Sequence, residues 1–80
     1  MRKPKYPFPL IELKWKDAQT GHGWEEAEDV DLDIPIVTTV GFLIKENEHA
    51  IMVASSVGDD KHNNARILIP MGMVVSRKEL

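Results

Sequence analysis

Residues 36–57 read IVTTVGFLIKENEHAIMVASSV, and this stretch decides the fold. It contains two runs rich in Val, Ile, Thr and Phe, separated by the polar Glu46-Asn47-Glu48. Two β-rich runs joined by a short polar turn predict a β-hairpin, with strands over 36–45 and 49–57. Gly41 interrupts the first run, and a glycine inside a strand usually marks a bulge or a sharp bend. We therefore expect a strongly bent sheet.

The chain before this hairpin predicts one more strand. From Leu10 to Trp15 apolar and charged residues alternate, with Ile11, Leu13 and Trp15 on one side. A period of two puts one face on the core and the other in water. Residues 1–9 contain three prolines, which cannot donate ladder hydrogen bonds at their own positions, so this segment reads as an extended lead-in.

The chain after the hairpin predicts two further strands. The turn-prone segment 58–64 separates the hairpin from a strand over 66–69. Pro70 then interrupts the ladder, residues 70–73 can form one tight turn, and a short last strand follows over 74–76. The resulting order is typical of a small five-stranded SH3-like barrel, with 17–35 as its long first loop. An OB-fold or a plain five-stranded meander is the alternative.

Length and composition restrict the class of protein. Eighty residues suit a single domain, here the lead-in 1–9 followed by the barrel 10–80. The absence of cysteine excludes disulfides and thiolate chemistry, and no apolar run approaches the roughly 20 residues that a bilayer span needs. We expect a cytoplasmic protein without a membrane partner.

The predicted loop 17–35 concentrates the negative charge. Residues 17–33 contain seven acids and no Lys or Arg, whereas residues 1–16 carry five basic residues against one acid. Trp24 lies within this loop, and because Trp contributes a large apolar area we expect it to fold the loop over the core as a lid. Asp29, Asp31 and Asp33 occupy alternate positions, as acidic ligands do in part of a calcium-binding loop, but the required glycine and terminal glutamate are missing. Neither a metal nor another cofactor is expected.

Three segments resemble short uncharacterised proteins of bacteriophages and prophages: LIELKWKDA at 10–18, VGFLI at 40–44 and ILIPMGMV at 67–74. The resemblance covers roughly residues 9–80. It implies a small phage accessory protein in the cytoplasm of a bacterial host, and it implies no mechanism.

No catalytic set is evident, so we expect a non-enzymatic interaction module that binds a host or phage protein through its acidic loop. The predicted contact residues are Trp24, Glu25, Glu26, Glu28, Asp29, Asp31 and Asp33. A mimic of the nucleic-acid backbone, or a merely solvated loop that favours solubility, would use the same residues. The alternative function is a nucleic-acid or nucleotide binder, with a patch of Arg2, Lys3, Lys5, Tyr6, Lys14 and Lys16, extended by Phe8, Arg77 and Lys78.

Both layers of the central hairpin are apolar, and the sequence leaves open whether Leu43 and Met52 are exposed or buried at an interface. A homo-oligomer would cover such a second layer.

Overall fold

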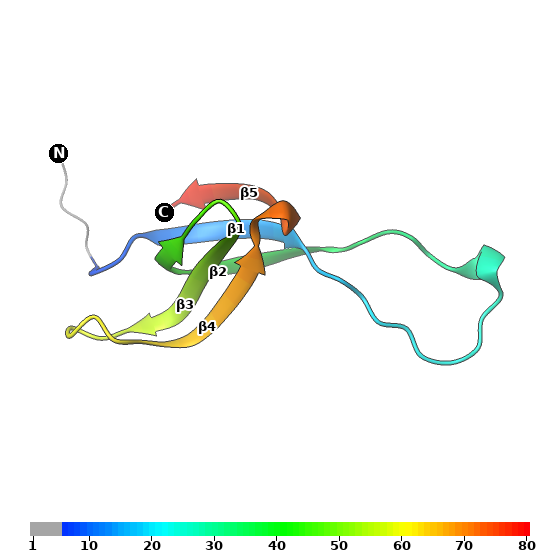
Figure 1. The fold of residues 1–80 in the computed structure, drawn as a ribbon, viewed down its shortest axis with the longest axis horizontal. Helices are drawn as coiled ribbons and strands as arrows, with labels where there is room; N and C mark the ends of the chain where they lie inside the picture. The colour runs from blue at the N-terminus through cyan, green and yellow to red at the C-terminus, as the bar shows by residue number, and fades with distance from the viewer. Residues whose placement is uncertain (1–5) are drawn as a thin grey trace.

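The structure, a computed structural model, describes residues 6–80. Five strands form a single antiparallel sheet with the order β4-β3-β2-β1-β5 (Figure 1). The strands are β1 (Leu10–Lys16), β2 (Ile36–Glu46), β3 (Ala50–Val57), β4 (Asn63–Pro70) and β5 (Val74–Glu79). Two single-turn 3-10 helices, η1 (Ala27–Asp29) and η2 (Met71–Met73), lie between strands.

The predicted strands are all present, and the two at the C-terminal end are longer than predicted. β4 begins at Asn63 because Asn63 and Asn64 pair with Val57 and Ser56 of β3, although asparagine has a low β-propensity. The ladder extends because its hydrogen bonds join backbone groups, whatever the side chains are. The predicted tight turn before the last strand is confirmed as η2. Segment 17–35 is the predicted loop, with η1 inside it.

β2 is shared between two halves of the sheet. Its residues 36–42 pair with β1, and its residues 42–46 pair with β3. At the junction, a Cβ on Gly41 would lie 2.5 Å from Cγ1 of Val53 and 2.8 Å from the carbonyl oxygen of Ala54. Real side chains do not come that close, so only glycine allows β3 to pass over β2 here. The bulge follows, as a register shift between Leu43 and Lys45.

The bend brings the inward faces of the two halves together. β1 contributes Ile11, Leu13 and Trp15, β3 contributes Ile51 and Val53, and β4 contributes Ile69. Partly buried residues complete this cluster: Val37, Leu43, Met71, Met73 and Val74. The indole Nε1–H of Trp15 donates to Oγ1 of Thr39 at 2.9 Å, so the one polar atom of this side chain is paired.

The sheet is not closed. The structure therefore confirms the five strands of the prediction but not their closure into a barrel. Within residues 6–80 no ladder joins β4 to β5, and these are the two edge strands. A side-chain contact connects the halves. The guanidinium of Arg77 donates to both carboxylate oxygens of Glu46, at 2.8 and 3.2 Å. Within the β3–β4 half, the backbone N–H of Met71 donates to the carbonyl of His49 at 2.8 Å and continues the ladder past the pair of Ala50 and Pro70. The hydrogen bonds from Arg77 lower the pKa of Glu46 from its ordinary value of 4.5.

Replacing Gly41 tests whether the close approach is required. Gly41→Ala is expected to lower the free energy of unfolding by about 1–3 kcal/mol, because the added methyl group overpacks the junction of β2 and β3. Gly72→Ala is the matched control, since its Cβ would meet nothing within 4 Å. The measurement is urea unfolding followed by circular dichroism. Equal stability of the two variants would contradict this account of the bend.

Candidate interaction surface

Residues 17–35 form an arm that leaves the sheet between β1 and β2, and we call it the acidic arm. Figure 1 shows it extending away from the sheet, on the right of the view. It contributes to the elongated dimensions of the molecule, 55 × 24 × 20 Å. Every residue from 18 to 35 is exposed. The acidic arm is therefore a projecting surface and not a cover for the core.

Trp24 has no place in the core, and the prediction that it folds the loop over the core as a lid is wrong. Its exposed fraction is 105%. The reason lies at the other end of the chain, where Met71 and Met73 of η2 and Val74 of β5 pack against the buried cluster. These residues cover the opening that a lid would have covered, so the core offers Trp24 no apolar site.

The acidic arm is shaped by hydrogen bonds within itself. In η1 the N–H of Asp29 donates to the carbonyl of Glu26 at 3.0 Å. Further along, the N–H of Asp33 donates to Oδ1 of Asp31 at 2.9 Å, which forms an Asx turn. Such local bonds give the arm a preferred shape without fixing it to the sheet.

Apolar and acidic residues alternate along the second half of the acidic arm. Val30, Leu32 and Ile34 are interleaved with Asp31 and Asp33. The exposed fractions of the three apolar residues are 48%, 86% and 49%. Val30 has extended backbone, in which a period of two places successive side chains on opposite sides. We call this segment, 30–34, the amphipathic edge of the acidic arm.

The predicted contact residues all lie in the acidic arm and all are exposed: Trp24, Glu25, Glu26, Glu28, Asp29, Asp31 and Asp33. They do not converge on a point. In the described part of the chain no three His, Asp or Glu side chains are grouped as metal ligands would be. The arrangement suits a long-range electrostatic contact more than the coordination of one ion.

The predicted basic patch is only partly assembled. Arg2, Lys3 and Lys5 lie outside the described residues. Lys14 and Lys16 are exposed on the outward side of β1, and Lys78 of β5 lies opposite Glu12 in the same register. These three lysines can share one face.

Two other members predicted for this patch have different roles. Arg77 is bound to Glu46 and faces the opposite side from its neighbour Lys78, so the prediction that it joins the patch is wrong. Tyr6 packs edge-on against Phe42, with ring centroids 5.3 Å apart. Its ring therefore serves at least partly to attach the lead-in to the sheet.

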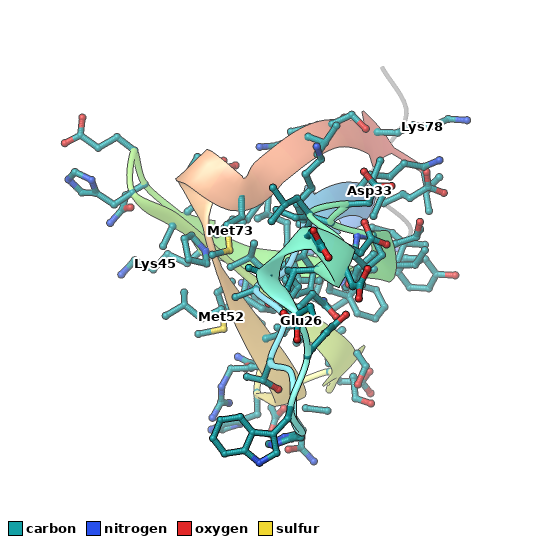
Figure 2. The ribbon with its side chains drawn as sticks, turned by 90° about the vertical axis from the view of Figure 1, so that its right-hand side faces the viewer. Glu26, Asp33, Lys45, Met52, Met73 and Lys78 are labelled. Atoms are coloured by element: carbon teal, nitrogen blue, oxygen red, sulfur yellow. The ribbon has the colours of Figure 1, made fainter. Side chains whose placement is uncertain are left out.

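Sequence reasoning missed a groove on the outward face of β2, β3 and β4. It has a volume of about 380 Å³, and its apolar floor consists of Ile44, Met52 and Leu68. Lys45 and Arg66 line it as well. Met52 pairs with Lys45 on one side and with Leu68 on the other, which brings three strands to one site. In Figure 2 Lys45 and Met52 lie on the same side of the sheet.

The alternation along β3 carries a signal for this groove, because Ile51 and Val53 point inward and Met52 must point outward. The second apolar layer that the sequence indicated therefore exists. Leu43 is not part of it, since this residue pairs with Val53 and packs against the core. Ile44, the next residue along β2, points outward and lines the groove instead.

Charges around the groove are mostly positive. Lys45 is exposed, and Nη1 of Arg66 donates to Oδ1 of Asn63 at 2.9 Å, which holds the guanidinium beside the groove. Glu46 also lines the groove, but its carboxylate is bound by Arg77. The groove thus combines an apolar floor with two cations that no acid offsets among these lining residues.

In residues 6–80 no helix has the length and apolar character of a transmembrane span.

The two tryptophans provide a matched test of the exposed acidic arm. Trp24→Ala is expected to change the free energy of unfolding by less than about 0.5 kcal/mol, because the side chain is fully exposed. Trp15→Ala should lower it by about 3–5 kcal/mol, since this indole is buried. Thermal and urea unfolding followed by circular dichroism measure both. A large loss in Trp24→Ala would mean that the arm packs on the core after all.

Comparison with protein-family models, with curated proteins and with solved structures gives no match.

Proposed function

We propose that this protein is a small non-enzymatic interaction module that binds a protein partner through its acidic arm. The observation that carries the proposal is the arm itself, in which every residue from 18 to 35 is exposed although it includes Trp24 and Leu32. Exposed apolar side chains of this size, gathered on one projecting segment, are typical of a contact surface.

The energetics support the same conclusion. A Trp side chain offers roughly 150–250 Å² of surface, so its full burial is worth about 4–6 kcal/mol before the costs of ordering. A domain of this size has a total stability of only a few kcal/mol. Leaving Trp24 in water therefore forgoes a large stabilisation, and a partner that covers it would recover part of it. The acids of the arm would speed the encounter with a basic partner.

The proposal of a non-enzymatic role rests on how the polar groups are arranged. Glu46, the carboxylate at the groove, is bound to Arg77, and its lowered pKa disfavours a role as a general acid. The acids of the arm spread along an extended segment. A binding role needs no convergent acid, base or nucleophile.

We infer further that the bent sheet is an open relative of the SH3-like barrel and that the protein is a phage or prophage accessory protein of the bacterial cytoplasm. Support for the first comes from the strand order, the long first loop and the 3-10 helix before the last strand. Support for the second comes from the resemblance of three strand segments to phage proteins.

Nucleic-acid binding is the second candidate function. The observation in its favour is the shared face of Lys14, Lys16 and Lys78. The seven acids of segment 17–33 repel a phosphate backbone, so we rank this function below protein binding.

The test is affinity capture from a bacterial lysate at low salt, with and without nuclease. Reversing Glu25, Glu26 and Glu28 to Lys should weaken the capture of the partner at least about tenfold, because the arm loses its acidic character. The matched control reverses Glu48, Asp59 and Glu79 to Lys, which changes the net charge equally outside the arm. Capture that survives the arm reversal would exclude the arm as the contact, and capture that nuclease abolishes would favour nucleic-acid binding.

A further inference from the structure

We propose that the partner of the acidic arm is a second copy of this chain, whose groove on β2, β3 and β4 receives the amphipathic edge. This inference rests on the proposed function and adds the identity of the partner. In the contact, Val30, Leu32 and Ile34 of one chain lie on the apolar floor of the other chain's groove. The flanking aspartates lie beside Lys45 and Arg66.

The two surfaces match in their apolar character. The floor of the groove is aliphatic and thioether, formed by Ile44, Met52 and Leu68, and Leu68 has an exposed fraction of 60%. The amphipathic edge presents aliphatic side chains at every second position. A volume of about 380 Å³ lies within the range of roughly 300–1,000 Å³ that is typical of ligand sites, and it can take a few aliphatic side chains.

The two surfaces also match in charge. Residues 17–33 carry seven acids without a Lys or Arg. At the groove Lys45 and Arg66 are positive, and Glu46 is neutralised by Arg77. Because the aspartates alternate with the apolar residues, seating the apolar side chains on the floor directs the carboxylates toward the margins. A basic margin around an apolar floor is the complement of that pattern.

The position of the arm favours a groove on another chain over its own. The acidic arm joins β2 at Ile36, whereas the groove lies at the other end of the strand, around Lys45. At about 3.3 Å per residue, these positions are roughly 30 Å apart along β2. Figure 1 shows the arm directed away from the sheet and from that end of β2. An arm in this position reaches outward to a neighbour.

Two chains that exchange arms form two identical contacts. A two-fold arrangement would make the surface self-complementary, and the second contact would form at a high effective concentration. Association should weaken as salt rises, because it depends partly on exposed charges.

The experiment is sedimentation equilibrium of the full chain from low micromolar to millimolar concentration, in low and high salt. The arm variant carries Asp29→Lys and Asp33→Lys, which changes the charge of residues 29–33, the part that enters the contact, from −3 to +1 and leaves the Asx turn at Asp31 in place. The groove variant carries Lys45→Glu and Arg66→Glu. Each variant alone should dissociate at least about tenfold more readily than the natural chain, because like charges then face each other.

Mixing the two variants is the decisive step. The positive segment 29–33 of the arm variant then meets a negative groove, and the natural arm of the groove variant meets a natural groove, so both contacts of a mixed pair are complementary. The mixture should associate to within about threefold of the natural chain. Circular dichroism of each variant confirms that it is folded. If the natural chain forms rings or larger assemblies instead of dimers, restored association in the mixture would support the same contact.

Three results would overturn the inference: a natural chain that is monomeric at every concentration, variants that associate like the natural chain, or a mixture without rescue. In each of these cases, arm-dependent capture of a different protein from lysate would leave the proposed function standing. If that capture fails and the chain is also monomeric, both the proposed function and this inference are contradicted.

Discussion

The structure depends on the close passage of β3 over Gly41. Because residue 41 has no Cβ, Val53 and Ala54 can approach the backbone of β2, and this strand can serve two partners in succession. The change of partner bends the sheet, and the bend places Ile51 and Val53 against the side chains of β1. A flat five-stranded sheet of the same sequence would leave these residues with no apolar layer to cover them. The packing of β3 against β1 thus depends on this close approach.

The same bend determines what stays uncovered. Once η2 and the start of β5 fill the open side of the core, no apolar site is left for the acidic arm, and Trp24 remains in water. The outward face of β2, β3 and β4 keeps an apolar groove because Ile44, which follows the inward Leu43, points outward on the same face as Met52 and Leu68. Two apolar surfaces of opposite charge therefore occur on one small chain. Their chemistry, more than the fold, supports a role in binding.

Much of the fold could be predicted, because alternation in β1 and the apolar runs around the polar turn at 46–48 are local signals. The placement of side chains that depends on contacts between distant segments could not be predicted. Whether Trp24 reaches the core depends on η2, which is distant in sequence, and no local pattern reports it. The face on which Leu43 lies is set by the pairing of β2 with β1, which the sequence does not reveal. The acidic segment is evident from composition, whereas alternation along β3 indicates only an outward Met52, and the groove itself requires three strands in register.

The central claim is that the amphipathic edge of one chain contacts the groove of another, and nuclear Overhauser effects between chains test it most directly. Chains with isotope-labelled methionine methyls would be mixed with chains that carry labelled leucine methyls, so that a cross-peak between the two labels arises only between molecules. The account predicts a cross-peak from Met52 of one chain to Leu32 of the other, lost in the variant with Lys45→Glu and Arg66→Glu. Concentrated samples without this cross-peak, or cross-peaks to Met52 only from leucines outside the arm, would contradict it.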